Sequence, residues 1–327
     1  MTTQADAEPT TPPAQPRTLR FTKGHGTHND FVLVADTRGD LDLTPEQVRR
    51  LTDRRGGVGG DGVIRLAPTA AIARAGESIA DEVLAQEPGA IWFMDYRNAD
   101  GSVAEMCGNG VRVFTAFAES LGLARLDDGG ELALGTRAGV RRVRKEQGPD
   151  GTPWYAVDMG AWLLPGGPEA EAAGADSAVA VRGWSAPRPA LSVDLGNPHT
   201  VVALASVDEL AGLDLTVAPQ VAPAPPHGTN VELVVPLGES AAEDGAVVGR
   251  VRMRVHERGV GETQSCGTGA VAAALAVRTW AAAGGREPVD TWFVEVPGGL
   301  LRVRALPGGR AELAGPAQLV FTGETRP

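Results

Sequence analysis

Cysteine is scarce in this chain of 327 residues, which contains Cys107 and Cys266 and no other. So few thiols exclude a disulfide-rich secreted scaffold and a zinc site made of four cysteines. Lysine also occurs twice, and neither Lys23 nor Lys145 has a sequence context typical of a Schiff-base lysine. The chain has no P-loop and no glycine-rich dinucleotide fingerprint after a strand. We therefore expect no bound cofactor and no metal site.

Long apolar runs and an excess of positive charge are also lacking. No stretch approaches 18 continuous apolar residues, so no membrane-spanning helix is predicted. Residues 1–17 lack the basic and apolar regions of a secretory signal and are typical of a disordered tail. The net charge of −11, without a compensating Lys/Arg stripe, argues against nucleic acid and anionic membrane as partners. We expect a cytoplasmic protein that acts on a small molecule.

The length suggests two domains, and local patterns predict their elements. The capping-box spacing from Thr44 to Gln47, with Pro45 at the first helical position, predicts a helix over 45–53. Residues 67–89, rich in alanine and glutamate, are interpreted as a surface insertion, and 164–189 and 217–226, rich in proline, as long connections. Strands are predicted over 19–23, 31–34, 63–66, 91–96 and 247–255.

Both cysteines occur in the same local pattern, about half the chain apart. Cys107-Gly-Asn-Gly and Cys266-Gly-Thr-Gly each precede a run of apolar residues at helical spacing. We interpret this as a weak internal repeat of two α+β halves related by a pseudo-two-fold axis. The equivalent loops would then face each other where the two domains meet, a common place for ligand sites.

Two thiols at helix starts have an evident chemical use. Backbone N–H groups and the helix dipole favour a thiolate and are expected to lower the thiol pKa. Like-charge repulsion in a shared pocket would leave one proton between the two groups. Such a pair could remove a proton from one face of a carbon and return one to the other, without a cofactor.

Other interpretations of the cysteines remain open from the residues alone. A lone cysteine before glycine is usually a small buried apolar residue, although its recurrence at two helix starts argues against this. A redox disulfide and a cysteine nucleophile in acyl transfer are further alternatives. The first usually takes the form Cys-x-x-Cys, which is absent, and the second would leave one thiol without a role.

Asparagine is nearly as scarce as cysteine and is confined to turn-like contexts. Asparagine favours turns in general. The composition of this chain is biased towards Ala, Gly and Arg, however, so an asparagine is expected to be kept only where its amide is hard to replace. The five asparagines together therefore indicate a site. They are Asn29, Asn98, Asn109, Asn197 and Asn230.

At this point several motifs, in order along the chain, closely resemble one family, the diaminopimelate epimerases. The motifs are Gly26-Thr27-His28-Asn29-Asp30-Phe31, Gly57-Val58-Gly59-Gly60-Asp61-Gly62, Asn98-Ala99-Asp100-Gly101-Ser102, Glu105-Met106-Cys107-Gly108-Asn109-Gly110-Val111-Arg112, Gly196-Asn197-Pro198-His199, and Glu257-Arg258-Gly259-Val260-Gly261-Glu262-Thr263 through Cys266-Gly267-Thr268-Gly269.

The resemblance implies an isomerase that interconverts LL- and meso-diaminopimelate without pyridoxal phosphate, in the synthesis of lysine and peptidoglycan precursors. It implies an α+β fold of two structurally similar domains, each a β-sheet wrapped around a central helix. We place the first domain at 18–149 plus 312–327 and the second at 150–311.

The resemblance also implies a role for each matching residue. Cys107 and Cys266 would be the acid/base pair, and His199 is a candidate auxiliary group or a structural histidine. The substrate would be held by Asn29, Asn98, Gly108, Asn109, Asn197, Asn230, Glu257, Arg258, Gly267 and Thr268. Arg258 suits a carboxylate because its guanidinium binds in a fork, and Glu257 suits an ammonium group.

Some positions depart from the family pattern. Gly62 stands where some members carry a glutamine that touches substrate, and Val113 replaces a third cysteine. The tail and the 67–89 segment are extra, which makes the dimer contacts of relatives an unsafe guide to any homodimer that this chain forms. A proline or hydroxyproline racemase of the same fold is the nearest alternative, but such enzymes carry His where Asn109 stands here. A non-catalytic amino-acid-binding protein of the same fold is a further alternative.

Overall fold

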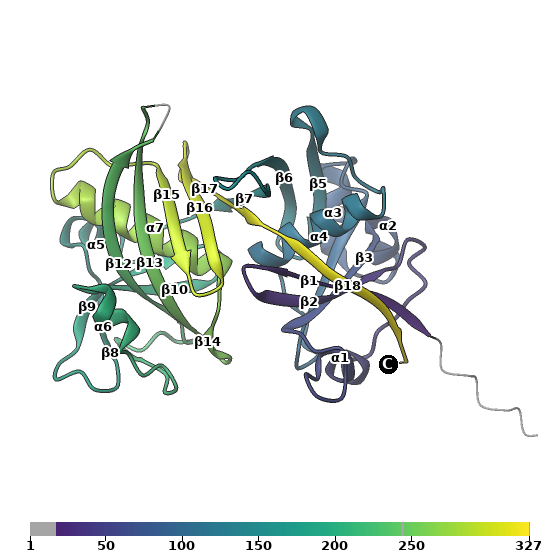
Figure 1. Cartoon of the computed structure of the whole chain (residues 1–327), viewed down its shortest axis with the longest axis horizontal. Coiled ribbons are helices and arrows are strands. Elements are labelled where there is room, and N and C mark those ends of the chain that lie inside the picture. The colour runs from purple at the N-terminus through teal and green to yellow at the C-terminus, as the bar shows by residue number, and fades with distance from the viewer. Residues whose placement is uncertain (1–17, 243–244, 327) are drawn as a thin grey trace, which may run out of the picture.

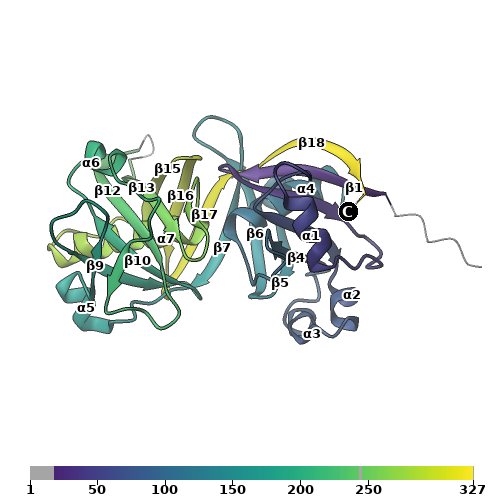
Figure 2. The same cartoon turned by 90° about the horizontal axis from the view of Figure 1, so that it is seen from below.

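The computed structural model describes residues 18–242 and 245–326, so the predicted tail at 1–17 lies outside it. The described chain forms two lobes side by side (Figure 1). The first half of the sequence forms one lobe and most of the second half forms the other. Strand β18, the last element, leaves the second lobe and runs across the first (Figures 1 and 2).

The first lobe contains a mixed sheet and four helices. Its elements are β1 (Leu19–Gly26), β2 (Asn29–Ala35), α1 (Pro45–Thr52), β3 (Gly62–Pro68), α2 (Thr69–Arg74), α3 (Ser78–Gln86), β4 (Trp92–Asn98), α4 (Gly108–Ser120), a 3₁₀ turn (Asp127–Gly129), β5 (Glu131–Thr136), β6 (Gly139–Gln147) and β7 (Pro153–Ala161).

The second lobe repeats this arrangement with extra short elements. It contains α5 (Gly167–Ala173), β8 (Ser177–Ala180), β9 (Arg188–Asp194), β10 (Pro198–Ala203), α6 (Val207–Ala211), β11 (Gln220–Ala222), β12 (Asn230–Ala241), β13 (Val247–Glu257), β14 (Gly261–Thr263), α7 (Gly267–Ala283), β15 (Thr291–Val296), β16 (Gly299–Leu306) and β17 (Arg310–Pro316), and β18 (Gln318–Thr325) follows.

The order of strand pairings shows the repeat directly. From β1 to β7, successive neighbours pair antiparallel, parallel, antiparallel, parallel, antiparallel and antiparallel. The series β9, β10, β12, β13, β15, β16 and β17 follows the same sequence of pairings. The predicted fold class, two similar α+β halves, is therefore confirmed.

Two strand pairs tie the lobes together. β7 pairs antiparallel with β6 of the first lobe and with β17 of the second, so both sheets continue through it. β18 pairs antiparallel with β1, which brings the end of the chain back to the first sheet. This return is the one that the resemblance implied, while the boundaries at 149/150 and 311/312 stay predictions.

Each lobe has a helix at its centre. From Gly108 to Ala118 every residue of α4 is buried, and α7 is buried along most of its length. Small residues make this packing tight: α7 carries Ala or Gly at more than half of its positions, so sheet residues approach its backbone closely. Both helices end at a turn that contains glycine, and both begin directly after a cysteine.

The predicted capping box of α1 is present, with Thr44 and Gln47 bonded to each other's backbone.

The predictions about connections need correction. Residues 67–89 are not merely a surface insertion, because Ile72 of α2 and Ala80 of α3 pack with Phe93 of β4 in a small core. The two proline-rich connections contain α5, β8 and β11, and β8 pairs with β11.

Within the described residues, no helix is long and apolar enough to cross a membrane.

Candidate active site

The two cysteines occupy equivalent positions at the starts of the central helices. Cys107 is the N-cap of α4 and Cys266 the N-cap of α7, both with extended backbone. Each Sγ accepts a hydrogen bond from the backbone N–H three residues on, at 3.4 Å from Gly110 and 3.3 Å from Gly269. The residue after each cysteine is glycine, so the first turn of each helix leaves its N–H groups uncovered by side chains.

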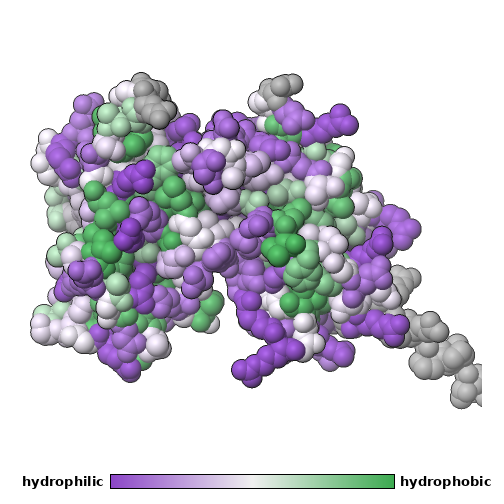
Figure 3. All heavy atoms as spheres, in the orientation of Figure 1, coloured by the Kyte–Doolittle hydropathy of each residue, from purple (hydrophilic) through white to green (hydrophobic). Residues whose placement is uncertain are grey.

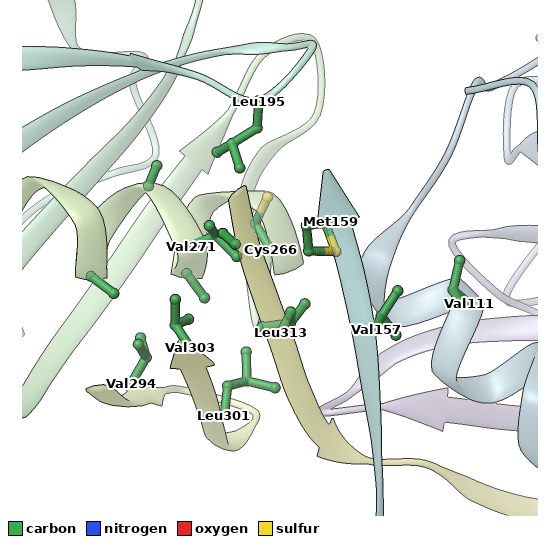
Figure 4. Packing of buried hydrophobic residues seen from close by; sticks show 14 of the residues in the cluster. Val111, Val157, Met159, Leu195, Cys266, Val271, Val294, Leu301, Val303 and Leu313 are labelled. Atoms are coloured by element: carbon green, nitrogen blue, oxygen red, sulfur yellow. The ribbon is translucent and has the colours of Figure 1, made fainter. Parts of the chain in front are cut away.

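The two helix starts meet over one leucine of β17. A Cβ placed on Gly108 or on Gly267 would lie 3.0 Å from Cδ2 of Leu313 in either case. Such a Cβ on Gly267 would also lie 3.1 Å from the side-chain oxygen of Asn109, which belongs to the other helix. In Figure 4, Leu313 lies below Cys266 and Met159. Both halves therefore contribute to one site, and its floor is apolar.

A hydrogen-bonded bridge joins the two cysteine loops. The Asn109 amide nitrogen donates to the backbone carbonyl and the hydroxyl of Ser265, both at 3.2 Å. Ser265 directly precedes Cys266. The Ser265 hydroxyl also lies 2.6 Å from that of Thr27, at the tip of the β1–β2 hairpin. Thr27 and His28 both have positive φ, a strained conformation for non-glycine residues that tight hairpins require.

The thiols are not acidified in this structure, contrary to the expectation from the helix starts alone. Burial raises the pKa of the Cys107 thiol to about 11, and the Gly110 N–H only partly opposes it. Burial also raises the pKa of the Cys266 thiol well above its ordinary value, helped by the carboxylates of Glu257 and Glu232. Desolvation therefore outweighs the helix ends, and both groups are held as thiols.

Cys107 faces the polar loop that contains Asn29. Its thiol donates to the Asn29 side-chain oxygen at 3.4 Å, and the Asn29 nitrogen donates to a carboxylate oxygen of Asp61 at 2.7 Å. Asp61 also accepts from the backbone N–H of Asp30 and from Arg54, at 3.0 and 2.7 Å. The carboxylate accepts and does not donate, so it fixes which end of the Asn29 amide faces the thiol.

Cys266 faces groups of the second lobe. Its Sγ lies 3.5 Å from the Thr268 hydroxyl, to which the Asn197 amide nitrogen donates at 3.2 Å. The Glu257 carboxylate also lies beside this thiol and accepts a hydrogen bond from the Thr263 hydroxyl. Burial raises the pKa of Glu257, so this carboxyl group accepts a proton more readily than an exposed glutamate.

His199 lies on β10, fully enclosed. Its Nδ1 is 2.7 Å from Oε1 of Glu232 on β12, and both side chains have no exposed surface. The other atoms of the pair, Nε2 of His199 and Oε2 of Glu232, have no hydrogen-bond partner. A Cβ on Gly269 would lie 2.7 Å from Oε1 of Glu232, which places the pair directly behind the start of α7.

The remaining predicted residues form a rim. Asn230 donates to the Pro198 carbonyl at 3.2 Å and accepts from the backbone N–H of Arg258 at 3.0 Å. The Arg258 side chain is exposed and its guanidinium donates to the His227 carbonyl at 2.7 Å. Asn98 ends β4 and donates to Ser102 at 3.0 Å, and no hydrogen bond between described residues links its side chain to either cysteine loop.

Gly62 has a structural reason to lack a side chain. It pairs with Asn98 in the sheet, and a Cβ there would lie 2.4 Å from the Arg97 carbonyl and 2.5 Å from the Tyr96 ring. A glutamine at this position would therefore require the backbone to shift. Replacing Gly62 by glutamine alone would not reproduce the substrate contact that this glutamine makes in some family members.

Several residues of the site were not singled out in the sequence. Glu232 could have been found from the sequence. It lies two residues after Asn230 in the same strand, so the two side chains lie on the same face, and it is a charged residue in an otherwise apolar run. Asp61 was quoted within a motif but given no role. Ser265 and Thr27 carry no local signal, since what matters is that the fold brings them together from opposite halves.

The donor set does not suggest a metal centre. Within residues 18–242 and 245–326, no cluster of three or more His, Cys, Asp or Glu side chains could hold an ion. Two thiols, carboxylates and amides around an apolar floor instead suit proton transfer on a polar organic molecule.

Comparison with known proteins agrees with this chemistry. The family model described as diaminopimelate epimerase matches residues 21–163 and 191–320. A diaminopimelate epimerase of Streptomyces coelicolor is 44% identical over 313 residues, which cover 94% of this chain and 95% of the relative. The chain belongs to the diaminopimelate epimerase family. Both cysteine loops and the rim residues lie within the matched ranges, so the repeat that brings them together is a property of the family's fold.

Solved structures add support for the fold. A phenazine biosynthesis protein of Bacillus anthracis superposes with a TM-score of 0.62 at 15% identity, covering 94% of this chain and 99% of that one. A hydroxyproline epimerase of Agrobacterium vitis gives 0.55 at 16% identity, covering 94% and 91%. At such identities the diaminopimelate epimerase family shares the architecture with these proteins, and the site residues must decide the chemistry.

Proposed function

We propose that this protein interconverts LL- and meso-diaminopimelate by exchanging the proton on one α-carbon between two thiols. One observation carries the proposal: Cys107 and Cys266 cap two helices whose first residues meet over Leu313. The reaction belongs to the synthesis of lysine and of peptidoglycan precursors. Membership of the family, at 44% identity over nearly the whole chain, supports the substrate.

The reaction begins with removal of one thiol proton. The Glu257 carboxylate lies beside the Cys266 thiol and has a pKa raised by burial, so we assign it to take that proton and leave a thiolate. The thiolate removes the α-proton from one face of the substrate, and the Cys107 thiol delivers its proton to the opposite face. The two sulfurs exchange protonation states, and the reverse reaction uses the opposite assignment.

The raised thiol pKa favours the chemistry. A thiolate whose conjugate acid has a pKa near 11, as at Cys107, is a stronger base than an ordinary cysteine thiolate. As the α-proton leaves, negative charge spreads into the substrate carboxylate. The uncovered N–H groups at Gly108-Asn109 and Gly267-Thr268 would bind that carboxylate, where the helix dipoles are positive.

The other end of the substrate would be held at the rim. We assign its carboxylate to Arg258 and its ammonium group to the side-chain oxygens of asparagines in the second lobe. Asn197 and Asn230 are already oriented by Thr268 and by the Arg258 backbone. Asn29 and Asn98 would complete the pocket from the first lobe. His199 is assigned as an auxiliary group that acts behind Cys266.

Deuterium exchange tests this function. In deuterated water, LL-diaminopimelate should gain α-deuterium and yield the meso isomer, and alkylation of the thiols should abolish both. The variants Cys107→Ala and Cys266→Ala should each abolish isomerisation. Proline and hydroxyproline serve as control substrates, because Asn109 disfavours a racemase of that type. Exchange with proline but not with diaminopimelate would overturn the proposal.

We further propose that the protein works in the cytoplasm as a homodimer. A reducing compartment suits the two free cysteines, which must stay unoxidised to transfer protons. Light scattering coupled to size-exclusion chromatography tests the assembly: a mass near twice 33.8 kDa is expected, and a monomer at micromolar concentration would contradict it.

A further inference from the structure

Arg112 is a buried cation on α4, five residues after Cys107 at the end of the first cysteine motif, and neither the sequence analysis nor the reaction described above gives it a role. Its side chain has no exposed surface. Its guanidinium donates to the Pro316 carbonyl at 2.9 Å, to the Thr27 hydroxyl at 3.4 Å and to the Asn109 side-chain oxygen. All three acceptors are neutral, and Nε has no partner. Among the described residues, no carboxylate forms an ion pair with it.

An unpaired buried charge is costly, so the surroundings of Arg112 require an explanation. The space is shaped around the guanidinium: a Cβ on Gly315 would lie 2.2 Å from Nη1, and one on Gly26 would lie 3.1 Å from Nη2. Burial lowers the pKa of Arg112 to about 10, and the one charge that counteracts this is a Cys107 thiolate. The missing counter-ion is thus an anion that appears in the site.

Arg112 also determines how Asn109 is oriented. A guanidinium can only donate hydrogen bonds, so the Asn109 atom that it touches must be the oxygen. The amide nitrogen is then directed to Ser265 and, at 3.3 Å, to the Asn29 oxygen. Ser265 precedes Cys266, and Asn29 accepts from the Cys107 thiol. One amide group, oriented by Arg112, therefore contacts the surroundings of both cysteines.

A second route from Arg112 leads to the same serine. The Thr27 hydroxyl donates to the Gly26 carbonyl at 2.7 Å, so its oxygen is left to accept from Arg112 and from Ser265. The Ser265 oxygen in turn accepts from the Asn109 nitrogen. These hydrogen bonds form a closed cycle through Arg112, Asn109, Ser265 and Thr27, and the cycle crosses from the first half of the chain to the second.

We propose that Arg112 is a positioning residue that holds the two cysteine loops in register across the lobe boundary, and that its unpaired charge attracts the anion formed there. This rests on the proposed function, because the anion is the Cys107 thiolate or the substrate carboxylate. Arg112 does not touch substrate. It acts through Asn109 and Ser265, and through its charge.

Two substitutions separate the geometric part from the electrostatic part. Arg112→Lys keeps the charge but loses the fork that contacts Asn109, Thr27 and Pro316 together. Arg112→Gln keeps a donor and loses the charge. Arg278→Gln on α7 is the matched control, since that arginine pairs with Asp290 near the surface. Thermal unfolding of each purified full-length variant checks that it is folded.

The first readout needs no substrate. In the Cys266→Ala background, alkylation of Cys107 by iodoacetamide is followed against pH. Arg112→Gln should move the midpoint to higher pH and slow alkylation about tenfold at pH 8, whereas Arg112→Lys and Arg278→Gln should leave the midpoint in place. An unchanged midpoint in Arg112→Gln would overturn the electrostatic part, whatever the substrate proves to be.

The second readout is isomerisation by variants with both cysteines. Arg112→Lys should lower kcat at least tenfold and change KM little, because the thiols lose register while the rim is intact. If Arg112 variants fail to fold, Ser265→Ala removes the hydroxyl that joins the Thr27 route to Asn109, keeps the bond from Asn109 to the Ser265 carbonyl, and leaves Arg112 in place. It should lower kcat to a similar extent. Wild-type kcat in folded Arg112→Lys, or in Ser265→Ala, would overturn the positioning role.

Discussion

Nδ1 of His199 lies 2.7 Å from Oε1 of Glu232, and both side chains are completely enclosed behind the start of α7. Nδ1 and the carboxylate oxygen share a hydrogen bond at this distance, and this bond fixes the orientation of the imidazole ring. The pair also places a carboxylate close enough to raise the pKa of Cys266.

Glu232→Gln should have two measurable effects. Removing the negative charge should lower the pKa of the Cys266 thiol, since Glu232 is one of the groups that raise it. Loss of the histidine's acceptor should lower kcat by roughly tenfold to a hundredfold, as for other residues that orient a functional side chain. Alkylation against pH in the Cys107→Ala background measures the first effect. Glu239→Gln, on an exposed ion pair with Arg286, is the control, and an alkylation midpoint that stays at the wild-type pH would contradict the argument.

The raised pKa of the thiols predicts slow alkylation of the folded, substrate-free protein. With the pKa of Cys107 near 11, its thiolate fraction at pH 7.5 is about three-hundredfold smaller than that of an ordinary cysteine with a pKa of about 8.5. Unfolding the protein in urea should restore the ordinary rate. The free energy of unfolding should also decrease as the pH rises above about 8.5, because the unfolded chain then releases thiol protons that the folded chain retains. Equal rates for folded and unfolded protein would show that the thiols are not desolvated.

The contact of both helix starts with Leu313 predicts that Gly267 tolerates no side chain. In Gly267→Ala the added Cβ would press on Leu313 and on Asn109 of the opposite helix. We expect about 1–3 kcal/mol of destabilisation and a loss of kcat of at least tenfold. Chemical denaturation and initial rates measure these. Gly284→Ala, at the other end of α7, has its nearest neighbours at 3.4 Å and should be nearly silent. Similar behaviour of the two variants would refute the contact.

The bond from Asn29 to Asp61 predicts that a change remote from the thiol alters catalysis. Asp61→Asn presents both a donor and an acceptor, so the Asn29 amide can turn its nitrogen towards Cys107. We expect kcat/KM to fall about tenfold to a hundredfold, with little change in unfolding temperature. Asp40→Asn, on an exposed pair with Arg38, is the control. If Asp61→Asn has the kcat/KM of the wild type, Asp61 does not orient Asn29.

The sequence predicted local features of the site well and long-range features poorly. The helix starts at the cysteines follow from short-range periodicity and glycine, and both were predicted within a few residues. The β8–β11 pairing was missed because it joins short strands about forty residues apart, within segments rich in proline. The pKa prediction was wrong because a helix N-terminus can be recognised in sequence, whereas the burial of a thiol depends on what the second lobe places above it.

The return of β18 to the first lobe has a consequence for synthesis on the ribosome. Strand β1 is translated long before β18 (Gln318–Thr325), with which it pairs antiparallel on the edge opposite β2. Until β18 has been translated, Phe21 lacks its edge-to-face contact with Phe321. The first lobe thus cannot complete its sheet during elongation, and nascent chains carry an open strand edge that favours association with other chains. The edge closes when β18 has been translated and pairs with β1.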